Sequence, residues 1–184
     1  MDFITGATGI VGRELVFQLI SAGHTVKALY RNNSDVTSVE NLITSRGLSL
    51  DRLTWVEGEL NDTQSLESSL KGCTRVFHVA ALVSFHPLDE ASLLKTNVEG
   101  TKNIVNAMLH KDVKTLVYVS SVAALGRQEN KIVDEETPFE DGIGETAYSR
   151  SKYLAELEVW RGQEEGLSVA VVNPSIIIGA GDFT

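Results

Sequence analysis

The 184-residue chain has little of several features that mark particular classes of protein. Its single cysteine, Cys73, excludes an internal disulfide framework and fits a reducing compartment. With 16 Lys and Arg against 25 Asp and Glu, the net charge is −9. This charge argues against nucleic acid or an anionic membrane as a partner, because both require a cationic face. The four histidines show no paired spacing typical of metal ligands, so we expect no metal site.

Long apolar runs are also missing. No stretch approaches the length of a membrane span, and no signal peptide precedes the first predicted strand. The remaining composition, with 42% hydrophobic and 22% charged residues, is typical of a globular protein long enough to bury a core. We therefore expect one soluble, cytoplasmic domain over residues 1–184.

The opening residues contain three spaced glycines, Gly6, Gly9 and Gly12, between a short apolar strand and an amphipathic helix. The first glycine permits a sharp turn, the second lets the backbone approach a pyrophosphate, and the third allows close packing of helix and strand. Thr8 and Ile10 belong to the same turn, where the helix N-terminus would face the phosphates. Ordinary turns contain glycines too, but the strand–turn–helix context favours a dinucleotide site.

Strands and helices alternate along the rest of the chain. This pattern predicts an α/β fold with a doubly wound parallel sheet, helices on both faces and right-handed crossovers. The predicted strands are 3–4, 25–30, 53–56, 75–80, 115–119 and 167–172, and the predicted helices are 10–22, 36–46, 63–71 (capped by Asp62), 88–110 and 147–165.

A second informative stretch contains Tyr148 and Lys152. Residues four apart on a helix share a face, and a nearby ammonium favours the phenolate over a phenol that ordinarily titrates near ~10. Such a tyrosine serves as a general acid or base near neutrality. The pair is common on solvated helix faces, but here it follows the fifth strand, which ends at Ser120-Ser121. Ligands of parallel sheets bind outside those carboxyl ends, so the serines and the tyrosine are expected to meet over one pocket.

Taken together, these motifs resemble the extended short-chain dehydrogenase/reductase family, also described as the NAD-dependent epimerase/dehydratase family. Within it, the chain is similar to the dihydroflavonol-reductase-like and 3β-hydroxysteroid-dehydrogenase-like branch. The resemblance implies a Rossmann-type sheet with strand order 3-2-1-4-5-6, and it runs along nearly the whole chain. The shared motifs are Thr5-Gly6-x-x-Gly9-x-x-Gly12, Phe77-His78-Val79-Ala80-Ala81, Asn97-Val98-Glu99-Gly100-Thr101, Val119-Ser120-Ser121, Tyr148-x-x-x-Lys152 and Asn173-Pro174-Ser175.

The resemblance assigns roles to particular residues. Tyr148 would be the proton donor or acceptor, while Lys152 would lower the pKa of the tyrosine and hold the nicotinamide ribose. Ser121, rather than Ser120, would hydrogen-bond the reacting carbonyl, and Asn97 would shape the site or relay protons. The cofactor contacts would come from the glycine turn, from Tyr148 and Lys152, and from Ala80, Ala81, Pro174 and Ser175.

The choice of cofactor depends on the end of the second strand. An acidic residue there would grip the 2′-hydroxyl of NAD, whereas an arginine accommodates the 2′-phosphate of NADP. The chain has Arg31, which favours NADP while leaving NAD open, and a solvated strand-end arginine is the alternative interpretation. Glu59-Leu60 stands where the family branch carries Asp-Leu near the adenine, and Glu59 as a plain loop carboxylate is an alternative.

Three functions compete at this point. The first is an NAD(P)-dependent reductase or dehydrogenase acting on a small carbonyl or alcohol, and the second is a nucleotide-sugar epimerase on the same scaffold. Dehydration is disfavoured, because Val122-Ala123 stands where family dehydratases place an Asp-Glu pair. The third is a non-catalytic dinucleotide-binding regulator, although such relatives tend to lack the Tyr148 and Lys152 pair.

Two further expectations come from the resemblance. Family members continue past the Asn173-Pro174-Ser175 strand into a smaller substrate lobe, so the chain is expected to be the cofactor half of a longer protein and to turn over poorly by itself. A homodimer is expected through the two-helix face typical of relatives, around 94–109 and 154–160.

Overall fold

The computed structural model describes residues 1–126, 132–139, 142 and 145–179. The described residues form a six-stranded sheet in the order β3-β2-β1-β4-β5-β6, in which every neighbouring pair is parallel. The predicted fold class and strand order are thereby confirmed. The strands are β1 (Asp2–Thr5), β2 (Val26–Tyr30), β3 (Leu53–Glu57), β4 (Arg75–His78), β5 (Thr115–Val119) and β6 (Ser168–Val172).

Most helices begin and end close to the predicted residues. Asp35 and Asp62 cap two of them, accepting hydrogen bonds from the backbone N–H groups of Ser38 and Ser65. The helices are α1 (Ile10–Ser21), α2 (Val36–Ser45), α3 (Thr63–Ser69), α4 (Glu90–Leu93), α5 (Gly100–His110) and α6 (Ala147–Glu164), with 3₁₀ turns η1 (Pro87–Asp89) and η3 (Val122–Ala124) and a π-helical segment η2 (Leu94–Glu99).

The prediction of a single helix over 88–110 is wrong, because four consecutive segments, η1, α4, η2 and α5, occupy that range. Sequence periodicity did not reveal the π-helical segment, because its cause is tertiary. Asn97 within it points its amide toward Leu82 of the segment after β4, and Gly100 packs so closely on Leu60 that a Cβ would lie 2.9 Å from Leu60 Cδ1. π-bulges of this kind often occur at functional sites.

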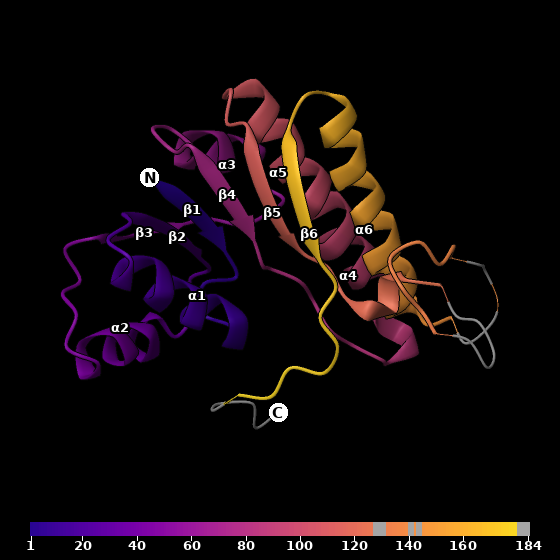
Figure 1. Cartoon of the computed structure of the whole chain (residues 1–184), viewed down its shortest axis with the longest axis horizontal. Coiled ribbons are helices and arrows are strands. Elements are labelled where there is room, and N and C mark those ends of the chain that lie inside the picture. The colour runs from indigo at the N-terminus through magenta and orange to yellow at the C-terminus, as the bar shows by residue number, and fades with distance from the viewer. Residues whose placement is uncertain (127–131, 140–141, 143–144, 180–184) are drawn as a thin grey trace.

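Two hydrophobic clusters lie on opposite faces of the sheet, as the alternation of strand side chains requires. Phe3 belongs to the cluster beneath α3, α5 and α6, whereas its neighbour Ile4 belongs to the cluster beneath α1 and α2. Figure 1 shows α1 and α2 on one side of the sheet and α5 and α6 on the other. The predicted helices on both faces are thus present.

After β6 the chain runs back toward α1 (Figure 1), where a Cβ on Gly179 would lie 2.6 Å from Ile10 Cγ2. Part of the loop predicted between the fifth strand and the last helix (127–131, 140–141 and 143–144) and the final residues 180–184 lie outside the described residues. No helix in the described part is both long and apolar enough to cross a membrane.

The turn from β1 into α1 has the tight geometry that its glycines predict. Gly6 has a φ of +70°, and a Cβ there would lie 2.6 Å from the backbone nitrogen of Ala80. A Cβ on Gly12 would overlap the carbonyl oxygen of Gly6, so this glycine lets α1 pack against the turn. A Cβ on Gly9, in contrast, meets only Gly6 O at 3.4 Å.

These contacts predict a difference between two alanine substitutions. We expect Gly12→Ala to lower the free energy of unfolding by about 2 kcal/mol or more, because the turn backbone cannot move aside without disturbing β1 and β4. Gly9→Ala, the matched control, should cost less than about 1 kcal/mol, the loss at a helix N-cap. Urea denaturation followed by tryptophan fluorescence measures both, and equal losses would contradict the assignment of the packing role to Gly12.

Candidate functional site

The predicted site residues gather at one edge of the sheet. Because all six strands are parallel, their carboxyl ends lie at this edge. The residues that follow the strands there are Gly6 after β1, Arg31 after β2, Glu59 and Leu60 after β3, Ala80 and Ala81 after β4, Ser121 after β5, and Pro174 and Ser175 after β6.

The N-terminus of α1 is suited to hold an anion. Gly9 is the N-cap, no side chain caps the helix, and the first turn carries no acidic residue. Backbone N–H groups at a helix start have no intrahelical partner and form the positive end of the helix dipole. Gly9 is exposed, and no side chain lies within 4 Å of the position that a Cβ would occupy there, so a phosphate can approach this backbone. The turn that includes Thr8 and Ile10 therefore fits a pyrophosphate.

Tyr148 lies in the first turn of α6, and a capping box fixes that turn. Thr146 accepts a hydrogen bond from the N–H of Ser149, and the Ser149 side chain accepts one from the N–H of Thr146. The half-buried Tyr148 ring packs edge-on against Phe85, with ring centroids 5.6 Å apart. Phe85 is 75% exposed and belongs to the segment after β4.

Lys152 is only 1% exposed, and its ammonium is held by β5. Nζ donates to Tyr118 Oη and to the Val119 carbonyl oxygen, each at 3.0 Å, and lies 4.7 Å from the centre of the Tyr118 ring. Burial lowers the pKa of Lys152 to about 8, an effect that the Glu156 carboxylate opposes. Burial also raises the pKa of Tyr118 well above its usual value, so its hydroxyl stays neutral.

This geometry adds a partner that the sequence analysis missed. Lys152 follows Tyr148 by one helical turn, as predicted, but the hydrogen bonds of its ammonium go to Tyr118 and Val119. That Lys152 lowers the pKa of the Tyr148 phenol stays a prediction. The sequence could have indicated Tyr118, because Leu116 and Tyr118 are two residues apart in β5 and therefore share its buried face.

The two serines after β5 have different surroundings. Ser120 is buried, and its hydroxyl donates to Glu156 Oε2 at 2.5 Å. Ser121 is half-buried, and its Oγ accepts a hydrogen bond from the N–H of Ala123 at 3.1 Å, which leaves the hydroxyl proton available to a ligand. The Ser120 hydroxyl proton is thus engaged and that of Ser121 is not within the described residues, while the contact of Ser121 with a substrate stays a prediction.

Asn97 joins the segment after β4 to α6. Its Oδ1 accepts from the N–H of Leu82 at 2.7 Å, and its Nδ2 donates to the Leu82 carbonyl at 3.0 Å and to Ser151 Oγ at 2.9 Å. Ser151 in turn donates to the carbonyl of Tyr148 at 2.8 Å. These bonds engage both amide protons and agree with a residue that shapes the site; the proton-relay role stays a prediction.

His78 lies in a buried chain of hydrogen bonds. Thr101 Oγ1 donates to the Asn97 carbonyl at 2.6 Å, so it accepts from His78 Nε2 at 3.0 Å. His78 Nδ1 is then an acceptor: the Thr5 hydroxyl donates to it at 2.6 Å, while Thr5 Oγ1 accepts from the N–H of Ala80 at 3.2 Å. Burial, together with the Lys152 charge, lowers the pKa of His78 to about 3, so the ring is neutral. This chain links the glycine turn to the helix that carries Asn97.

Of the residues expected to contact the adenosine part of the cofactor, Arg31 and Glu59 are exposed. Arg31 is exposed, and its backbone N–H donates to Ser34 Oγ at 3.1 Å. Leu60 packs on Gly100, and its carbonyl accepts from Asn103 Nδ2 at 3.0 Å, whereas Glu59 is exposed. The adenine contacts of Glu59 and Leu60 stay predictions. No cluster of three or more potential metal ligands occurs in the part of the chain that the structure describes.

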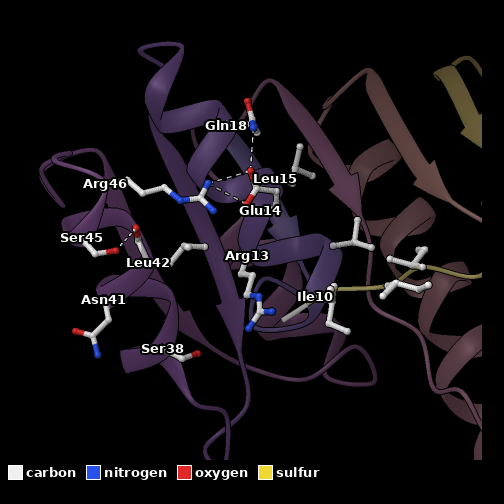
Figure 2. Close-up of a pocket in the computed structure, with 14 residues that line it drawn as sticks. Ile10, Arg13, Glu14, Leu15, Gln18, Ser38, Asn41, Leu42, Ser45 and Arg46 are labelled. Atoms are coloured by element: carbon white, nitrogen blue, oxygen red, sulfur yellow. Dashed lines mark hydrogen bonds and ion pairs between the residues drawn. The ribbon is translucent and has the colours of Figure 1, made fainter. Parts of the chain in front are cut away.

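A separate cavity of about 870 Å³ lies between α1 and α2 (Figure 2). Ile177 to Gly179 border it, and Glu14 lies in its wall, bound to Gln18 at 2.9 Å and to Arg46 at 3.2 Å. Of the predicted site residues, Ile10 alone lines it. This cavity is not the expected pocket over the serines and Tyr148, which stays a prediction.

Comparisons with known proteins show which family the chain resembles. A family model described as "NAD dependent epimerase/dehydratase family" matches residues 3–184. A Synechocystis sp. protein that carries the provisional name dihydroflavonol 4-reductase is 39% identical over 98% of this chain and 50% of its own length. Sterol demethylase protein B of Methylococcus capsulatus is 34% identical over 98% of this chain and 52% of its own length.

Solved structures show the same likeness. The crystal structure of gox2253 is 37% identical, with a TM-score of 0.81 over 95% of this chain and 51% of that one. A short-chain dehydrogenase/reductase superfamily protein from Agrobacterium tumefaciens, solved with bound NAD, is 27% identical, with a TM-score of 0.73 over 94% of this chain and 48% of that one. The chain thus spans about half the length of the relatives it matches.

The buried, neutral His78 predicts a loss of stability in acid. Its pKa is about 3 in the folded protein and near ~6.5 when unfolded, so the unfolded state binds more protons as the pH falls through that interval. We expect His78 to remove about 2 kcal/mol of stability between pH 7 and pH 5.

Denaturant titrations of the wild type and of His78→Gln at both pH values measure this difference. The variant should be less stable at pH 7 but should lose less between pH 7 and pH 5. His86→Gln, which changes an exposed histidine, should keep the wild-type pH dependence. Identical losses in wild type and His78→Gln would show that His78 is not the group responsible.

Proposed function

The chain belongs to the NAD dependent epimerase/dehydratase family, and we propose that the protein is an NAD(P)-dependent oxidoreductase acting on a small carbonyl or secondary alcohol. One observation supports this most: Lys152, one helical turn after Tyr148, is bonded to Val119 at the carboxyl end of β5, two residues before Ser121 and on the sheet edge that carries the open glycine turn. The names of the reductase relatives, including cinnamoyl-CoA reductase 1 of Petunia hybrida at 32% identity, point in the same direction.

The cofactor part of the proposal depends on the glycine turn. The uncapped N–H groups at the start of α1 and the open position at Gly9 would hold the pyrophosphate. The nicotinamide then supplies or accepts the hydride. Lys152 would hold the nicotinamide ribose through the ammonium proton that its bonds to Tyr118 and Val119 leave over.

The protein's own chemistry is proton transfer and orientation. Tyr148 would donate its hydroxyl proton to the substrate oxygen during reduction and take it back during oxidation. Ser121 would donate a hydrogen bond to the same oxygen, where negative charge develops. The charge of Lys152 would favour the Tyr148 phenolate. Asn97, through Ser151, would hold the turn of α6 on which Tyr148 lies.

A second function has a specific observation in its favour. MoeE5, solved in complex with UDP-glucose and NAD, is 26% identical to this chain with a TM-score of 0.74. A nucleotide-sugar epimerase would use the same tyrosine, but it would return the hydride to its own substrate. Net formation of the oxidised or reduced cofactor during turnover therefore distinguishes the oxidoreductase from the epimerase.

Substitution of the tyrosine tests the proposed chemistry. In the complete protein, Tyr148→Phe should lower kcat by about 10²- to 10⁴-fold, because the proton donor is removed. Its dinucleotide affinity should stay close to that of the wild type. Tyr153→Phe is the matched control, since Tyr153 lies on the same helix, stacked on Phe139, and should keep its activity. Unchanged turnover in Tyr148→Phe with intact cofactor binding would reject the role.

Calorimetric titration tests the cofactor preference. We expect the complete protein to bind NADP more tightly than NAD, because the Arg31 guanidinium would contact the 2′-phosphate. Arg31→Gln should weaken NADP binding by about 10- to 100-fold, the worth of a charged hydrogen bond, and leave NAD binding nearly unchanged.

Arg52→Gln is the control, because Arg52 bonds the Gly23 carbonyl beside the amino end of β3. It should leave both affinities unchanged. An equal effect of Arg31→Gln on the two cofactors would contradict the preference.

A further inference from the structure

Glu156 lies on α6 one helical turn after Lys152 and two turns after Tyr148, and its carboxylate accepts three hydrogen bonds. Oε2 accepts from Ser120 Oγ at 2.5 Å and from Asn173 Nδ2 at 3.1 Å, and Oε1 accepts from Trp160 Nε1 at 3.2 Å. Ser120 follows β5 and Asn173 follows β6. One carboxylate therefore ties the helix that carries Tyr148 to two strand ends.

The same contacts hold the backbone of Ser121. Asn173 Nδ2, besides its bond to Glu156, donates to the Ser121 carbonyl at 3.2 Å. On either side of Ser121, the N–H of Ser120 donates to the Val172 carbonyl at 2.8 Å and the N–H of Val122 donates to the Pro174 carbonyl at 3.0 Å. Ser121 is thus clamped to the end of β6, and Glu156 orients the amide that makes the clamp.

Glu156 also acts on Lys152 through its charge. The groups that contact the ammonium or act on its charge are Tyr118 and the Val119 carbonyl from β5, His78 from β4, and Glu156 from α6. His78 and Tyr118 are uncharged at neutral pH, because burial opposes their ionisation. The carboxylate of Glu156 raises the pKa of Lys152 against the effect of burial.

We propose that Glu156 is a positioning residue for the reaction, one that orients Ser121 through Asn173 and keeps the buried Lys152 ammonium charged. This inference rests on the proposed function, since Glu156 would act through Ser121 and Lys152, to which that function assigns roles. Only an unprotonated carboxylate combines the two roles. It accepts from the hydroxyl and the amide on one oxygen, and it carries the negative charge that a neutral amide lacks.

Two substitutions separate the geometric role from the charge. Glu156→Gln retains an oxygen that accepts from Ser120 and Asn173 but removes the charge. Glu156→Asp retains the charge but withdraws it by one methylene from both partners. Glu164→Gln is the matched control, because it neutralises an exposed carboxylate two turns further along α6.

The experiment uses the complete protein and combines kinetics with an NMR titration of the ¹³C-labelled Lys152 side chain. In Glu156→Gln, the titration midpoint of Lys152 and the alkaline limb of the kcat–pH profile should both move down by about 0.5 to 1 pH unit. In Glu156→Asp, the midpoint should stay near that of the wild type, while kcat falls by about tenfold with little change in dinucleotide Kd. Glu164→Gln should match the wild type in all measurements.

The outcomes are distinct. An unshifted Lys152 midpoint in Glu156→Gln, or a loss of kcat in Glu156→Asp no larger than its loss of folded protein, would overturn the inference. A wild type that shows no redox turnover would reject the proposed function instead. The lysine titration would then still decide whether Glu156 controls the charge of Lys152, because it needs no turnover.

Discussion

The buried ammonium of Lys152 is the constraint on which the rest of this edge depends. Removing a charged amine from water is costly unless its protons find acceptors. The Tyr118 hydroxyl and the Val119 carbonyl supply them, while the Tyr118 ring and the Glu156 charge add further stabilisation. These partners come from β5 and α6, so the ammonium is satisfied only when the helix lies in one place over the strand. The position of Tyr148 on that helix follows from the same requirement.

A second set of buried bonds relates this helix to the glycine turn. A chain of hydrogen bonds runs from Thr5 at the end of β1 through His78 of β4 and Thr101 to the carbonyl of Asn97. Asn97 then reaches α6 through Ser151. Each of these groups has its partner, and no buried side-chain nitrogen or oxygen in the described residues lacks one. Fully satisfied polar networks hold a unique arrangement, because any shift would leave a buried group without a partner.

Much of the fold could be predicted from local patterns. Alternating strand and helix periodicities indicated the parallel sheet, and the spacing of Gly6, Gly9 and Gly12 indicated the turn that opens it. The spacing of Tyr148 and Lys152 placed both on one helical face. These features depend on steric limits of the backbone and on burial of one face of each element, which neighbouring residues reveal. The continuous helix predicted over 88–110 was wrong for the opposite reason, because the π-helical segment bonds through Asn97 to Leu82, outside the helical pattern.

The sequence by itself determined the alternation of strands and helices, the glycine turn and the shared helical face of Tyr148 and Lys152, while its resemblance to a known family supplied the strand order and the expected site roles. Only the tertiary structure decided which groups the side chains at this edge contact. Lys152 bonds Tyr118, Tyr148 packs on Phe85, and Glu156 accepts from Ser120 and not from Ser121. The reason is physical. Backbone periodicity depends on neighbours a few residues away, whereas the partner of a buried polar group is set by strands and helices that meet only after the chain has folded.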